Sequence, residues 1–139
     1  ATSAYMREWL AAHYEHEPRV TVDTSPDPYY CVEHGDTSLF FHHGHLKKMG
    51  EVDQAFVAKF REVFGRTKRS YGHVGHLHHR VAQESSLMVV EQHQTLAAQD
   101  AYASRHGYKA DRSAQVITYH RAHGEVGRVR LTPEMVHAA

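Results

Sequence analysis

Apolar residues recur at helical spacing in two parts of the chain. In residues 4–15 the large apolar side chains that share one helix face are Tyr5, Met6, Trp9, Leu10 and Tyr14. A second amphipathic helix is indicated by the four-residue repeat of Val52, Phe56, Phe60 and Phe64. Gly65 is placed to end that helix. Because large aromatic side chains at helical spacing usually face a core, we expect Trp9 and Phe56 to be buried.

Shorter extended segments alternate with these helices. They are residues 29–34, 38–43, 87–90, 115–119 and 126–131. Gly35-Asp36 joins the first two segments and is a strong hairpin signal, and His123-Gly124 is placed in a turn between the last two. Thr95 is positioned to cap a further helix that would run to His106. The pattern predicts one α/β domain over residues 1–139, with helices packed on a mixed sheet.

Composition narrows the class of protein. With 41% hydrophobic and 23% charged residues, the chain of 139 residues is typical of a soluble globular domain. Its 16 Lys and Arg balance its 16 Asp and Glu, so no global field attracts nucleic acid or an anionic membrane. A single cysteine excludes an internal disulfide and suits a reducing compartment. Because no apolar run is long enough to span a bilayer, we expect a cytoplasmic protein with no membrane partner.

Histidine is the residue type that changes this picture most. The chain holds 15 histidines, and histidine is the commonest metal ligand in proteins. Two segments stand out, His43-Gly44-His45 at a predicted strand end and Gly75-His76-Leu77-His78 further along. Residues two apart in an extended backbone point to the same face, so His76 and His78 suit two neighbouring metal ions, with His43 as a further ligand. A chance pair of surface histidines is the alternative interpretation.

Other motifs add little to this hypothesis. The chain has no G-x-S-x-G sequence and no phosphate-cradling glycine loop, which argues against serine hydrolases and P-loop proteins. Basic residues flank the histidine segments, and a solvated face explains them better than a nucleic-acid docking edge, because the net charge is zero. These residues are Lys47, Lys48, Arg61, Arg66, Lys68 and Arg69.

The order of the two histidine segments resembles the later part of calcineurin-like metallophosphoesterases. In that family an H-G-H element ends one strand and a G-H-x-H element follows a later strand. The resemblance covers the chain from about Tyr29 onward, and its tail is similar to phage-associated members. The tail segments are residues 90–92, 100–102, 107–108, 119–120 and 124–128. The resemblance implies the C-terminal half of that fold, a partial sandwich.

Site residues follow from the resemblance position by position. The implied metal ligands are His43 and His76 on one ion and His78 on the other. The implied substrate contacts are His45, beside the first ligand, and the phosphate-contact candidates His73 and His79. The implied cofactors are divalent ions (Mn, Zn, Fe or Ni), and two of them would be bound only in the complete enzyme. The implied partner is a phosphoester substrate, which nucleic acid could supply.

Three elements of the family are absent from the sequence. They are the D-x-H, G-D-x-x-D and G-N-H-D/E elements, which would supply the metal-binding carboxylates and a histidine that acts on the leaving group. Three imidazoles can hold one borderline ion such as zinc or nickel, but without a bridging carboxylate two close dications repel each other. We therefore expect a C-terminal fragment of a phosphoesterase that hydrolyses poorly or not at all by itself.

A module without catalysis is the alternative function. Such a module would keep the fold and bind a metal, or would form homo-oligomers. Missing strands would expose sheet edges and apolar surface, both of which favour self-association.

Overall fold

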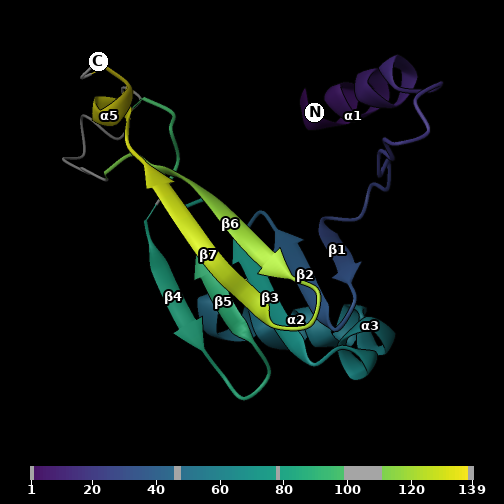
Figure 1. Cartoon of the computed structure of the whole chain (residues 1–139), viewed down its shortest axis with the longest axis vertical. Helices are drawn as coiled ribbons and strands as arrows, with labels where there is room; N and C mark the ends of the chain where they lie inside the picture. Colours follow the sequence, from purple (N-terminus) through teal and green to yellow (C-terminus); the bar gives the residue numbers. More distant parts are fainter. Residues whose placement is uncertain (1, 46–47, 78, 99–110, 138–139) are drawn as a thin grey trace.

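The central element is a mixed sheet of five strands. The computed structural model describes residues 2–45, 48–77, 79–98 and 111–137. The strands are β1 (Tyr29–His34), β2 (Thr37–His42), β3 (Arg69–Val74), β4 (Val81–Glu84) and β5 (Val89–Gln92). Their order is β1-β2-β3-β5-β4, in which β2, β3 and β5 are parallel and both outer strands are antiparallel to their neighbours. The carboxyl ends of the three parallel strands therefore meet at one edge of the sheet (Figure 1).

Two short helices cover one face of this sheet. The connection from β2 to β3 contains η1 (Met49–Glu51), α2 (Val52–Lys59) and α3 (Arg61–Arg66). Phe56 of α2 is fully buried, as the sequence predicted, in a core with Phe40, Val52, Val74, Met88 and Val90. The helix predicted over residues 52–64 is interrupted at Phe60, whose backbone is not helical. This break allows the Phe60 ring to pack on the Phe40 ring, with 5.8 Å between centroids.

A two-stranded hairpin covers the opposite face. The hairpin consists of β6 (Ala114–His120) and β7 (Gly124–Leu131), which confirms the predicted closing pair of strands. It lies across the sheet on the side away from α2 (Figure 1). Thr37 Oγ1 donates a hydrogen bond to the His120 carbonyl oxygen at 2.9 Å, and Tyr71 Oη accepts one from Glu125 N–H at 3.1 Å. The fold is thus mixed α/β, with a layer on each face of the five-stranded sheet.

The N-terminal helix does not join this core. α1 (Thr2–His13) forms where the sequence predicted a helix, but it lies apart from the sheet (Figure 1). The prediction that Trp9 is buried is wrong, because 61% of this residue is exposed. Its ring stacks on His13 with 5.0 Å between centroids. Arg7 connects the helix to the sheet through a hydrogen bond of 2.6 Å to Tyr30 Oη.

Three other differences from the predicted elements concern a helix, an edge strand of the sheet and the C-terminal segment. Most of the helix predicted over residues 95–106 lies outside the described residues, and residues 95–98 are not helical. The sequence pattern did not indicate β4, because all four of its residues are exposed and show no apolar alternation. The short helix α5 (Pro133–His137) was also not predicted. Among the described residues, no helix is long and apolar enough to cross a bilayer.

The contact between β3 and α2 gives a stability test with a matched control. A Cβ atom at Gly72 would lie 2.9 Å from Phe56 Cε2 and 3.1 Å from Val90 Cγ2. We expect Gly72→Ala to lower the free energy of unfolding by about 1–3 kcal/mol through overpacking. Gly65→Ala is the control, because a Cβ there meets nothing within 4 Å, and alanine in a helix should add about 0.5–1 kcal/mol. Urea unfolding followed by circular dichroism measures both, and equal effects would contradict the packing argument.

Candidate metal centres in two histidine clusters

The first cluster lies at the carboxyl ends of β2 and β3. His43 follows β2 directly, and His76 follows β3 by two residues. Because these strands are parallel neighbours, the two imidazoles meet, with 3.1 Å between His43 Nε2 and His76 Nδ1. The His45 ring lies next to them, with its centroid 5.3 Å from that of His43 and 6.3 Å from that of His76. The structure therefore brings together three of the six predicted site residues.

The loops that follow β2 and β3 have backbone conformations that bring His43 and His76 together. Gly44 has a φ of 98°, and a Cβ atom there would lie 3.0 Å from the Gly75 carbonyl oxygen. The Gly75 N–H donates a hydrogen bond of 3.1 Å to the His43 carbonyl oxygen and so joins the loops directly. His76 has a φ of 72°, a left-handed conformation that is uncommon for a residue with a side chain. The expectation that His76 continues an extended strand is therefore wrong, because β3 ends at Val74.

A buried histidine supports this loop from the helix side of the sheet. His42, the last residue of β2, is only 5% exposed and stacks on Tyr29 with 4.3 Å between ring centroids. Its Nδ1 accepts a hydrogen bond from Gly44 N–H at 2.9 Å. Its Nε2 is buried and has no hydrogen-bond partner among the described residues. Burial lowers the pKa of His42, so the ring is neutral and fixes the start of the loop.

The separation of His43 and His76 fits shared coordination of one ion. Zinc binds histidine nitrogen at about 2.0–2.1 Å with tetrahedral geometry, which places two ligand nitrogens roughly 3.3 Å apart. The observed separation is 3.1 Å. The predicted ligand of the other ion, His78, lies outside the described residues. His79 is exposed, and its carbonyl oxygen accepts a hydrogen bond of 3.0 Å from Gln92 Nε2.

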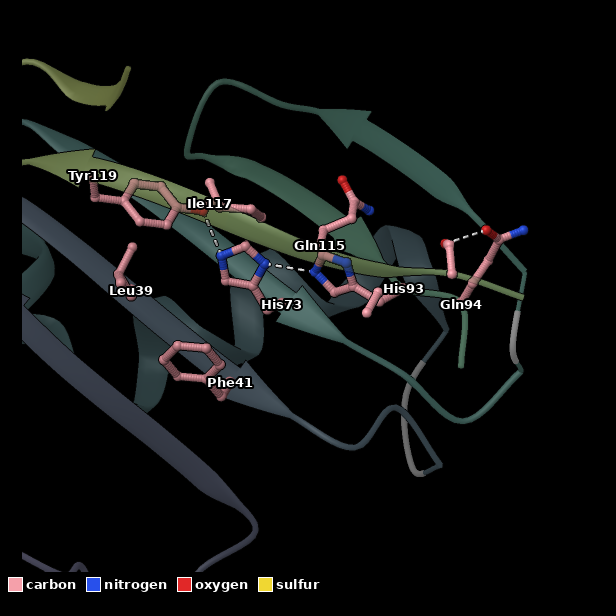
Figure 2. Close-up of a pocket in the computed structure, with 10 residues that line it drawn as sticks. Leu39, Phe41, His73, His93, Gln94, Gln115, Ile117 and Tyr119 are labelled. Atoms are coloured by element: carbon pink, nitrogen blue, oxygen red, sulfur yellow. Dashed lines mark hydrogen bonds between the residues drawn. The ribbon is translucent and has the colours of Figure 1, made fainter. Parts of the chain in front are cut away.

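The second cluster lies between the sheet and the hairpin. It contains His73 of β3, Glu91 of β5 and His93, which follows β5. His73 is the centre of a chain of hydrogen bonds, with 2.8 Å from its Nδ1 to His93 Nε2 and 2.8 Å from its Nε2 to Tyr119 Oη (Figure 2). His73, Glu91 and His93 each offer one ligand atom, and these three atoms all lie within 4.8 Å of one another. Among the described residues, no other group of three or more His, Cys, Asp or Glu meets this distance limit. The group can therefore hold a metal ion.

The imidazoles of this cluster are held neutral. Burial lowers the pKa of His73 to about 4 and lowers the pKa of His93 as well. Burial raises the pKa of Tyr119 far above its ordinary value, so its hydroxyl keeps its proton and can donate it to His73 Nε2. With Tyr119 as the donor, His73 carries its proton on Nδ1 and donates it to His93 Nε2, because a neutral imidazole has one donor and one acceptor nitrogen.

Glu91 links this cluster to the hairpin. Its two carboxylate oxygens accept hydrogen bonds of 2.5 Å and 2.7 Å from the two terminal nitrogens of Arg128. Gln115 Nε2 lies 3.4 Å from the same carboxylate, and His93 Nδ1 lies 4.0 Å from it. Burial alone would raise the pKa of Glu91, but hydrogen bonds from Arg128 and the nearby positive groups lower it overall. A charged carboxylate is thus kept between the layers by a bidentate guanidinium.

Sequence reasoning found the first cluster and missed most of the second. Glu91, His93 and Tyr119 contribute to neither predicted histidine element, and His73 was considered only for phosphate contact. One signal was present, because Glu91 and His93 are two residues apart at a strand end and so share a face. A cavity of about 970 Å³ has residues of both clusters in its lining, among them His43, His45, His73 and His93.

Comparison with known proteins gives no family for this chain. No family model matches it, and neither a curated protein nor a solved structure shows significant similarity. The function is therefore inferred from the geometry of the two clusters.

The basic residues near the histidine segments are partly engaged in ion pairs, such as Arg66 with Glu33 at 2.6 Å and Lys68 with Asp36 at 3.6 Å.

The partly buried pair His73 and His93 predicts a pH-dependent stability. Both folded pKa values lie below the unfolded value of about 6.5. Their stabilisation is therefore complete above pH ~6.5 and is lost as the pH falls through the folded values. From His73 alone, we expect the free energy of unfolding of the metal-free chain to drop by about 3 kcal/mol between pH 7 and pH 4.

Urea unfolding at a series of pH values measures the slope of the free energy of unfolding against pH. His73→Gln should flatten it, because the titrating group is removed. His16→Gln is the control, since the His16 side chain is 94% exposed. If His73→Gln leaves this pH dependence unchanged, the assignment of a neutral, partly buried pair is contradicted.

Proposed function

We propose that this chain provides the histidine half of a two-metal phosphoesterase site of the calcineurin-like type. The observation that supports it is the meeting of His43 and His76 at the carboxyl ends of adjacent parallel strands. In open α/β sheets, ligands bind outside the carboxyl ends of the strands. The sheet with helices on one face also fits the C-terminal half of that fold.

The residues of the first cluster have distinct roles in this proposal. His43 and His76 hold one ion and His78 the other, as the order of the two histidine elements implies. When bound, such ions polarise a phosphoryl oxygen and lower the pKa of bound water. The Gly44 and Gly75 loops hold the imidazoles in place through the His43–Gly75 backbone hydrogen bond. The proposal requires carboxylate ligands from beyond these 139 residues.

The surrounding cavity suits an anionic phosphodiester. Arg7 lines the same cavity as His43 and His45, and its guanidinium is oriented by Tyr30 Oη and the Ser25 carbonyl oxygen. Guanidinium groups bind phosphate oxygens through two parallel hydrogen bonds. Arg7 and His45 are therefore the side chains that we expect to contact the phosphate. The substrate class is a phosphodiester, which includes nucleic acid.

A binding module that forms oligomers is the second candidate. It is favoured by apolar side chains that the fold leaves exposed, such as Trp9 on α1 and the register partners Val116 and Val129 on the hairpin. Exposed apolar groups of this kind commonly mark contact surfaces. A concentration-dependent increase in molar mass by light scattering would favour this candidate, and a monomer at all concentrations would exclude it.

Metal content tests the proposed site directly. In protein purified without a histidine tag, we expect His76→Ala or His43→Ala to remove about one divalent ion per chain relative to wild type, because each variant removes one of the two imidazoles that hold that ion. Elemental mass spectrometry gives the stoichiometry. His16→Ala is the matched control, since His16 lies on the exposed surface far from either cluster in sequence. Equal metal content in all four proteins would refute the proposed site.

The requirement for outside carboxylates gives a separate prediction. With bis(p-nitrophenyl) phosphate and added manganese or zinc, we expect the 139-residue chain to hydrolyse no faster than the metal alone. Two dications cannot be held closely together without an anionic bridge. Hydrolysis that is well above this background and is abolished by His76→Ala would show that the chain completes its site by itself.

A further inference from the structure

We propose that His73, Glu91 and His93 form a second metal site, separate from the His43–His76 cluster, that takes a single zinc-like divalent ion. One ring nitrogen of each histidine and a carboxylate oxygen of Glu91 all lie within 4.8 Å of one another. The two nitrogens that already face each other, His73 Nδ1 and His93 Nε2, are the ligand atoms in this proposal. The inference rests on the layer between sheet and hairpin and does not depend on the proposed phosphoesterase function.

The parallel ladder between β3 and β5 places these ligands in advance. His73 and Glu91 are register partners on adjacent strands, so their side chains leave the same face of the sheet. His93 lies two residues beyond Glu91 and returns to that face. Its amide donates a hydrogen bond of 2.9 Å to the Val74 carbonyl oxygen, which extends the ladder past the end of β5. The two imidazole rings stack at 5.0 Å with an angle of 27° between their planes.

The donor set selects the ion. Two imidazoles and one carboxylate are the ligands of many catalytic zinc sites, in which a fourth position stays open. Calcium and magnesium prefer oxygen ligands alone, so they are disfavoured here. The two nitrogens are 2.8 Å apart and need to separate to roughly 3.3 Å, the spacing of two ligands on one tetrahedral ion. A small rotation of either ring achieves this change.

Binding changes the tautomer of His73 without a net change in protons. In the metal-free arrangement in which Tyr119 donates to His73 Nε2, His73 Nδ1–H donates to His93 Nε2. Coordination needs the Nδ1 lone pair, so the proton moves to Nε2, which then donates to the Tyr119 oxygen. Tyr119 thus orients the ligand through its second nitrogen, as partners of metal-bound histidines commonly do. Arg128 orients the Glu91 carboxylate in the same way.

The open position of this site faces a cavity. A hollow of about 480 Å³ between sheet and hairpin has His73 and His93 in its lining, together with the apolar side chains Leu39, Phe41 and Ile117 (Figure 2). The site can therefore accept water or a small oxygen-donor ligand with an apolar body as its fourth partner.

Zinc titration in a double variant isolates the second site. In metal-free His43→Ala/His76→Ala protein, isothermal titration calorimetry should still detect about one zinc ion per chain. Adding His93→Gln should weaken that binding on the order of a hundredfold, because loss of a ligand exceeds the 10–100-fold effect of an outer partner. His34→Gln, on the exposed surface of β1, is the matched control. Unchanged affinity in His93→Gln overturns the proposal.

A measurement on the wild-type chain tests the second site without a substitution that could prevent folding. Long-range proton–nitrogen NMR spectra should show His73 protonated on Nδ1 without metal and on Nε2 after one equivalent of zinc. His93 Nε2 should shift with it. If zinc moves only the resonances of other histidines, the second site does not exist. Failure of the proposed phosphoesterase site is seen separately, as unchanged metal content in His43→Ala and His76→Ala.

Discussion

Parallel pairing of β3, with β2 on one side and β5 on the other, is the constraint on which both clusters depend. The register places Phe40 beside Gly72 and His42 beside Val74, so both strands end at the same level. The loops that follow them therefore meet, and His43 lies against His76. The same pairing needs Gly72, because the Phe56 ring occupies the space that a side chain would take. One close contact between α2 and β3 thus fixes the level at which the histidine loops begin.

Because side chains alternate between the two faces of a strand, the apolar core and the polar network of the sheet lie on opposite faces. On the helix face the alternation gives an apolar core around Phe40, Phe56 and Val90. On the hairpin face it gives a polar network from Tyr119 through His73 and His93, beside the pair of Glu91 with Arg128. Buried polar groups are costly unless every member has a partner. The hairpin therefore stabilises the sheet only when its arginine and tyrosine are in position, which makes this network a determinant of how the layers align.

The two clusters differ in what their surroundings permit. The first is formed by loops whose imidazoles are exposed, and one of its residues, His76, has a left-handed backbone, a conformation that often marks functional loops. The second is formed by strands, and burial keeps its imidazoles neutral. A neutral imidazole is the form that binds metal. Two candidate metal sites, one exposed and one partly buried, thus lie on a single sheet.

Local sequence determined α1, the helical segment around Phe56, the hairpin of β6 and β7, and the residues His43, His45 and His76 of the first cluster. Helical spacing located Phe56, and the glycines beside His43 and His76 indicated loops of close approach. The exposure of Trp9 was not predictable, because an amphipathic pattern shows which face is apolar but not whether anything covers it. The second cluster was decided by tertiary structure, because His73, Glu91, Tyr119 and Arg128 come from strands paired across long loops. Only the strand register and the placement of the hairpin, which depend on interactions between distant segments, bring those side chains within hydrogen-bonding distance.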